Sequence, residues 1–193
     1  MDALDILRLA GHCTVEEICV EVANLFSVRP TEIGLLRAQG EFLGFLYPPE
    51  LQAVGVIPLS STAVAARTAT TKKSELFNNF SNVPHHTVFE LVKLPSPDTT
   101  EDTGHLKIQK FMSAPILGEN GKVLGVLQVS RKGLSPHSAG ADFTECDLRK
   151  LENAAQTIAD LCPSFLHGAV KRPCGKLQLH SEQKKAPSRG AKA

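Results

Sequence analysis

The chain has 193 residues, of which 42% are hydrophobic, and this is enough for one domain with a real core. Because it contains nine Phe, one Tyr and no Trp, the core must be mainly aliphatic. The 21 Lys and Arg nearly balance the 20 Asp and Glu, and no apolar run approaches the roughly 18 residues that cross a bilayer. The N-terminus carries Asp2 and Asp5 and no basic segment, unlike a secretory signal. We therefore expect a cytoplasmic protein that does not enter a membrane.

The nearly balanced charge conceals a difference between the two ends of the chain. Residues 168–193 contain seven Lys or Arg and one acid, a net charge of +6, which leaves −5 for residues 1–167. The basic segment cannot bury enough apolar surface to offset its ordering entropy. We expect a folded domain over 1–167 and a disordered tail over 168–193. The acidic domain argues against a nucleic-acid-binding fold, so only the tail could contact nucleic acid or another acidic partner.

The first elements predicted along the chain are two helices. Residues 2–10 suit a short helix that Gly11 ends. Thr14 and Glu17 have the spacing of a capping box, in which each side chain binds the backbone amide of the other residue. Apolar residues then recur every three or four positions, which predicts an amphipathic helix over 14–27.

The middle of the chain predicts shorter elements. The stretches EIGLLRA (32–38) and EFLGFLY (41–47) flank a Gln-Gly pair and indicate a hairpin that Pro48 ends. Four elements are then predicted in chain order: a helix over 61–69 capped by Ser60 or Ser61, a short strand within 74–80, a short helix over 85–93, and a polar loop over 95–104.

The strongest pattern is a pair of long strands, 106–117 and 122–131, joined at Asn120-Gly121. Both are mostly apolar without strict alternation, which indicates a sheet covered on both faces. A second capping box at Thr144 and Asp147 then begins a long helix. This order of elements predicts an α+β layered domain. The terminal helices should cover one face of the sheet, and the segment 58–104 should cover the other.

The stretches SAPIL, GKVLGVLQVS and DFTECDLRKLENAA, in this order, resemble motifs of the GAF domain family of small-molecule sensors. The resemblance covers about 14–165. It implies a central antiparallel sheet of about five to six strands, N- and C-terminal helices on one face, and short helices and loops on the other. It also implies a small-molecule ligand, of unknown identity, between the sheet and the middle segment.

The implied ligand pocket has six candidate residues: Asn78, Asn79, His85, His86, Phe89 and Gln128. Gln128 raises the sharpest question because it lies in an apolar strand. An amide buried without partners costs on the order of 1–3 kcal/mol. If Gln128 faces inward, its side chain therefore needs a ligand, a water or a backbone group of a helix.

Cyclic-nucleotide-binding members of the family carry a signature from which this chain departs. Ser130, Arg131 and Leu148 replace its Asn, Lys and Glu, whereas Phe143 and Asp147 agree with it. We therefore do not expect cyclic-nucleotide binding. We interpret Arg131 and Asp147 as a structural ion pair between the end of a strand and the last helix.

Other chemistries find less support in the sequence. Adjacent histidines such as His85 and His86 point about 100° apart on a helix, so we expect no metal site there. The five cysteines include no C-x-x-C pair, and none lies between Cys19 and Cys146. Bilin attachment and the free methionine sulfoxide reductases of the family both need cysteines near the pocket. We therefore expect no enzyme, and a redox sensor through Cys146 or a metal sensor is a weaker alternative.

The main hypothesis is a ligand sensor that signals through its terminal helices to an unidentified downstream protein. We expect a homodimer through these helices, because they carry apolar positions beyond those that cover a sheet: Cys19, Phe26, Ala154 and Leu161. The competing hypothesis is a dimerisation or interaction module whose pocket is filled by its own Phe and Leu side chains.

Overall fold

The computed structural model describes residues 14–53, 55–82, 106–161 and 166. Its centre is one antiparallel sheet of six strands in the order β3-β2-β1-β6-β5-β4. The two longest strands, β5 and β6, lie side by side next to the β4 edge of the sheet, with β1 on the other side of β6. The strand bounds are β1 Ile33–Gln39, β2 Phe42–Tyr47, β3 Val56–Pro58, β4 Glu75–Phe77, β5 Lys107–Leu117 and β6 Val123–Gly133.

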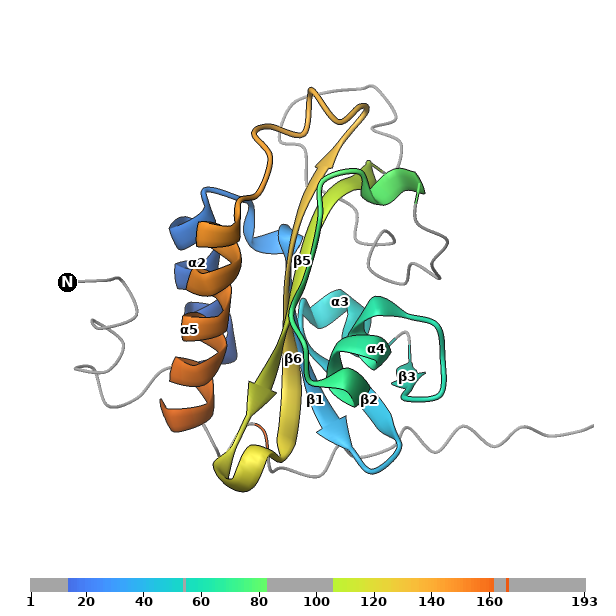
Figure 1. Cartoon of the computed structure of the whole chain (residues 1–193), viewed down its shortest axis with the longest axis vertical. Helices are drawn as coiled ribbons and strands as arrows, with labels where there is room; N and C mark the ends of the chain where they lie inside the picture. Colours follow the sequence, from blue (N-terminus) through green and yellow to red (C-terminus); the bar gives the residue numbers. More distant parts are fainter. Residues whose placement is uncertain (1–13, 54, 83–105, 162–165, 167–193) are drawn as a thin grey trace, which may run out of the picture.

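Helices cover both faces of this sheet (Figure 1). The two long helices, α2 and α5, lie together on one face, and the short helices α3 and α4 lie on the other. The helix bounds are α2 Val15–Phe26, α3 Pro49–Gln52, α4 Val64–Thr71 and α5 Glu145–Leu161, with short 3-10 turns η1 Pro30–Glu32, η2 Phe80–Asn82 and η4 Glu119–Gly121. The predicted α+β class and the placement of the N- and C-terminal helices are therefore confirmed.

Both long helices begin at the predicted capping boxes. At α2, the Thr14 amide donates to Glu17 Oε2 at 2.7 Å, and the Glu17 amide donates to Thr14 Oγ1 at 3.2 Å. At α5, Thr144 and Asp147 make the equivalent pair of bonds at 2.9 and 3.2 Å. Each box satisfies backbone donors that have no partner inside the helix.

Two apolar cores lie on opposite faces of the sheet. The core under α2 and α5 takes one set of side chains from β5 and β6, among them Met112, Leu127 and Val129. The core under α3 and α4 takes the alternate set, among them Phe111 and Val126. Because each long strand is buried on both faces, its sequence shows no polar stripe, as predicted.

Some element boundaries differ from the sequence prediction. The helix expected over 61–69 begins later, at Val64, and Ala63 at its N-cap provides no side-chain cap. Ser60 and Ser61 instead lie in a turn in which the Ser61 amide donates to the Pro58 carbonyl at 3.0 Å. The short elements α3 and β3 were not predicted. The helices expected over 2–10 and 85–93 and the tail lie outside the described residues. Within the described part of the chain, no helix is long and apolar enough to cross a membrane.

Candidate functional site

A short row of buried polar side chains crosses the sheet face that α4 covers. The row consists of Thr68 from α4, Ser113 from β5 and Gln128 from β6, which are 0%, 0% and 4% exposed. Thr68 Oγ1 and Ser113 Oγ are 2.8 Å apart, and Gln128 Nε2 donates to Ser113 Oγ at 3.3 Å. We call these three residues the polar row.

The register of the two long strands brings the row together. Ser113 and Gln128 are direct partners across the β5–β6 ladder, so their side chains lie on the same face. Their neighbours Met112, Leu127 and Val129 point to the opposite face, into the core under α2 and α5. The strand that carries Gln128 therefore contacts both layers of the domain.

Gln128 is the least satisfied member of the polar row. Its amide nitrogen makes one long hydrogen bond, to Ser113. Among the described residues, no donor reaches its Oε1 oxygen. This oxygen is not among the fully buried side-chain atoms that lack a partner, which include Oε1 of Gln109 on β5 instead. The backbone of α4 does not donate to it, and a hydrogen bond from a ligand would contribute about 0.5–1.5 kcal/mol.

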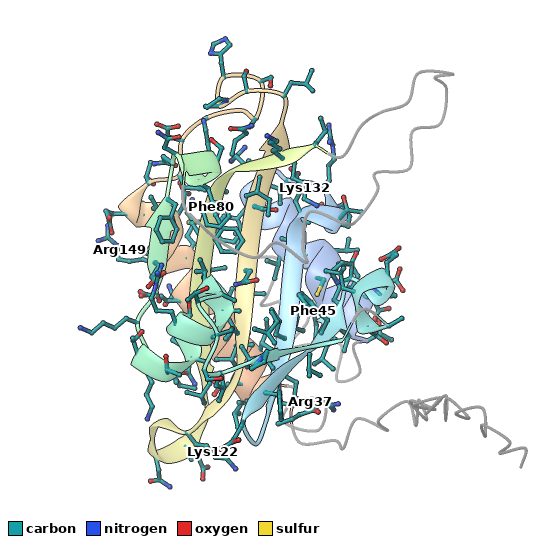
Figure 2. All side chains as sticks on the ribbon, turned by 90° about the vertical axis from the view of Figure 1, so that its right-hand side faces the viewer. Arg37, Phe45, Phe80, Lys122, Lys132 and Arg149 are labelled. Carbon is teal, nitrogen blue, oxygen red and sulfur yellow. The ribbon has the colours of Figure 1, made fainter. Side chains whose placement is uncertain are left out.

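Aromatic side chains lie around the polar row on the same face of the sheet. Phe80 of η2 stacks on Phe111 of β5 with ring centroids 4.6 Å apart, and Phe77 lies 5.6 Å from Phe80. Phe45 of β2 lies toward the opposite edge of this face (Figure 2). Phe45, Phe80 and Phe111 are all at most 5% exposed. These rings fill much of the space on this face with the protein's own side chains.

The other predicted ligand residues have different positions. Asn78 is half-buried and binds the backbone of Phe143 twice, because its Nδ2 donates to the carbonyl at 2.9 Å and its Oδ1 accepts from the amide at 2.8 Å. The neighbouring Asn79 is exposed. His85, His86 and Phe89 lie outside the described residues, so their role stays a prediction.

The predicted ion pair between Arg131 and Asp147 is not formed. The Arg131 guanidinium carbon lies 4.7 Å from the centre of the Phe143 ring, and Nη2 donates to the Phe26 carbonyl at 3.2 Å. The Asp147 carboxylate instead accepts from the amide and hydroxyl of Thr144 at 2.9 and 2.8 Å and lies 3.2 Å from Lys150 Nζ. Local partners occupy Asp147, whereas Arg131 joins the ends of the two long helices.

Asp147 gives a prediction about acid stability. Burial raises the pKa of this carboxyl, but hydrogen bonds from Thr144 and the nearby Lys150 ammonium lower it more, so its pKa lies below the ordinary value. Asp147 therefore stabilises the fold above its unfolded pKa, and this contribution is lost as the pH falls through its folded pKa. We expect Asp147→Asn to be less stable than the parent in urea unfolding at about pH 6 and to differ little at about pH 2.

The matched control is Glu152→Gln, which neutralises an exposed acid on the same helix and should leave the pH profile unchanged. A stability difference between Asp147→Asn and the parent that was equal at both pH values would contradict this role of the carboxylate.

Two open hollows of about 530 and 700 Å³ lie elsewhere, beside α5. Gln156 lines both, and the smaller one also meets the turn before β4 and the end of β5. Neither includes a member of the polar row. They are surface grooves on the helix side of the sheet and do not coincide with the predicted ligand face.

The described residues show no alternative reactive centre. No group of three or more His, Cys, Asp or Glu residues among them could hold a metal ion. Cys19 is buried in the core under α2 and α5, and burial raises the pKa of its thiol above the ordinary value. Cys146 is exposed in the first turn of α5. The other three cysteines lie outside the described residues.

The comparisons with known proteins agree with this architecture. The family model of the GAF domain matches residues 11–161, which is most of the chain. The chain belongs to the GAF domain family. GAF domains are a sensor and signalling family, so the resemblance seen in the sequence is confirmed together with the fold. No curated protein matches this GAF domain in sequence.

Solved structures share the fold at low sequence identity. The GAF domain of a Coxiella burnetii phosphoenolpyruvate-protein phosphotransferase is 12% identical with a TM-score of 0.60, covering 84% of this chain and 91% of that one. The corresponding Acinetobacter domain is 14% identical with a TM-score of 0.58, covering 83% and 90%. A type II free methionine-R-sulfoxide reductase from Thermoplasma acidophilum is 14% identical with a TM-score of 0.51, covering 85% and 97%.

These solved structures limit the functional conclusions that the fold alone allows. They include GAF domains of phosphotransferases and a reductase, so the fold by itself does not decide whether this GAF domain is catalytic. Sequence reasoning identified Gln128 but missed Ser113 and Thr68. Ser113 could have been found, because it is a polar residue in the middle of the partner strand. Thr68 gave no signal of its own within its helix.

Proposed function

We propose that this GAF domain is a non-enzymatic sensor that binds a small molecule on the α4-facing side of the sheet, over the polar row. The observation that supports the proposal is the buried carboxamide of Gln128, whose oxygen has no donor among the described residues. A ligand with an N–H or O–H group would satisfy this oxygen. The family's role in sensing makes a small-molecule ligand the natural candidate.

The proposed signal passes through the terminal helices to a separate protein. β6 presents Gln128 on the ligand face and Leu127 and Val129 on the face against α2 and α5. A ligand that shifts β6 therefore changes the packing on both faces of the sheet. Such a shift requires the ligand to bind one arrangement of the helices more tightly than the other.

The proposal that the domain is not an enzyme rests on the distribution of its cysteines. No cysteine lies between Cys19 and Cys146, so the central segment of this chain lacks the thiols that a free methionine sulfoxide reductase would need. Of the two described thiols, Cys19 is buried and protonated, and Cys146 is on the opposite face of the sheet from the polar row.

Replacing Gln128 with leucine tests the assignment of the ligand face. Leucine keeps the volume and removes the amide, so we expect any compound that the domain binds to lose about tenfold in affinity, the effect of one neutral hydrogen bond. The measurement is a thermal-shift screen of the full chain with amino acids, nucleobases and small carboxylic acids, followed by calorimetric titration of each compound that stabilises it.

The matched control is Gln156→Leu, because Gln156 is exposed on α5, which covers the opposite face of the sheet from the polar row. This variant should bind as the parent does. Unchanged affinity in Gln128→Leu would remove Gln128 from the site.

A second candidate function is an interaction module with a filled pocket, and the buried rings of Phe45, Phe80 and Phe111 favour it. The sequence argument for dimerisation is weaker than expected, because Cys19, Phe26 and Ala154 are all buried within one subunit. Of the four extra apolar positions, only Leu161, at 36% exposed, remains available to a partner. Light scattering of the full chain separates the two: a dimer that binds no compound in the screen supports the module.

A further inference from the structure

The side chain of Asn78 joins the two layers of the domain at the edge of the sheet. It follows β4, the edge strand, and precedes η2 on the ligand face. Its carboxamide pairs with both the amide and the carbonyl of Phe143, at 2.8 and 2.9 Å. Both distances are ideal for N–H···O bonds, so Asn78 binds the Phe143 backbone as a neighbouring strand would.

Phe143 lies at a point where contacts connect the two long helices. It immediately precedes Thr144, the residue that caps α5, and its ring is buried in the core under α2 and α5. Arg131 of β6 stacks on this ring at 4.7 Å and donates to the carbonyl of Phe26, the last residue of α2. A cation within about 6 Å of a ring centre is attracted to it. The start of α5 and the end of α2 therefore share one anchor.

Asn78 is also linked, through η2, to the ligand face of the sheet. Phe80 lies two residues after Asn78 and stacks on Phe111, beside the polar row. A displacement of η2 therefore moves the backbone that carries Asn78. N–H···O hydrogen bonds span about 2.7–3.2 Å between donor and acceptor, so a shift of about 1 Å would break the pair with Phe143. The paired hydrogen bonds between Asn78 and Phe143 are thus either formed or broken, as in a two-state conformational switch.

We propose that Asn78, Phe143 and Arg131 form a bridge that couples η2 on the ligand face to the facing ends of α2 and α5. With the bridge closed, the start of α5 is held to the sheet edge. When η2 moves, Asn78 releases Phe143, and the anchor shared by both helices loosens. This inference rests on the proposed function for its biological use, because a ligand over the polar row would be what moves η2.

The bridge can be tested without any ligand by amide hydrogen exchange of the full chain. Asn78→Ala removes two hydrogen bonds, so we expect exchange over residues 143–148 to rise about tenfold. Phe80→Leu disturbs η2 and should raise exchange over the same residues. In the double variant, Phe80→Leu should add little to the effect of Asn78→Ala, because the connection is already broken.

The matched control is Asn79→Ala, which removes the adjacent, exposed asparagine and should change exchange over 143–148 by less than about twofold. If Phe80→Leu does not fold, Phe111→Leu disturbs the same ring stack from the strand side. The bridge is overturned if Asn78→Ala leaves residues 143–148 protected, or if the ring substitution acts equally strongly with and without Asn78.

This test also separates the bridge from the proposed function. Failure of the exchange experiment would leave ligand binding at Gln128 intact, with another route to the helices. A domain that binds no compound could still show the coupling, since the ring substitution replaces the ligand as the disturbance.

Discussion

Leu151→Ala is expected to lower the free energy of unfolding by about 2–5 kcal/mol. Leu151 lies in the middle of α5 at 0% exposure, in the core that joins α2, α5 and the sheet. Removing three carbons there loses transfer free energy and leaves a cavity that a packed helix cannot easily close. Urea unfolding followed by circular dichroism measures the change.

The matched control is Leu134→Ala, the same substitution at a residue that is 89% exposed beyond the end of β6. It should change stability by less than about 0.5 kcal/mol. A similar loss at both positions would mean that α5 does not pack on the sheet as described.

Gly125→Ala is expected to destabilise the domain by about 3 kcal/mol, the upper part of the range for overpacked cores. Gly125 lies in β6 opposite Arg37 of β1, where an added methyl group would overlap the backbone carbonyl oxygen of Leu36. A backbone atom in the middle of a sheet cannot move aside as a side chain can. The same urea titration detects the effect.

Gly118→Ala is the control, because the three atoms nearest to its methyl group would all belong to the Leu124 side chain, the first of them at 2.8 Å. That side chain can rotate, so the cost should be about 1 kcal/mol. Equal stability of Gly125→Ala and the parent would show that β1 and β6 do not pair in this register.

The sequence predicted best where one local signal agreed with the pattern around it. Asn120 and Gly121 have φ values of 60° and 68°, the left-handed conformation that these two residue types favour, and they join β5 to β6 as expected. The capping boxes at Thr14 and Thr144 begin the helices that they predict. In each case, the signal and the structure involve residues close together in the chain.

Contacts between distant elements could not be predicted in the same way. The match to the family signature suggested an ion pair between Arg131 and Asp147, but Thr144 and Lys150, which are closer to Asp147 in the chain, occupy its carboxylate. The Phe26 carbonyl that Arg131 binds carries no sequence signal, because every residue has a carbonyl group. The pairing of Asn78 with the Phe143 backbone was missed for the same reason.

In the candidate site too, local features could be predicted from the sequence and contacts between distant elements could not. The polarity of Gln128 within an apolar strand marked the ligand face, and strand alternation could also have identified Ser113. The contact of Thr68 with Ser113 depends on packing between α4 and the sheet, which composition and periodicity do not specify. The predicted roles of His85, His86 and Phe89 concern residues that the structure does not describe.

Native mass spectrometry of the full chain purified from its source cells tests the ligand-sensing account most directly. We expect the parent and Gln156→Leu to retain a small molecule and Gln128→Leu to retain clearly less of it. A bare mass for all three proteins, with no compound raising the melting temperature of the parent, would contradict the account.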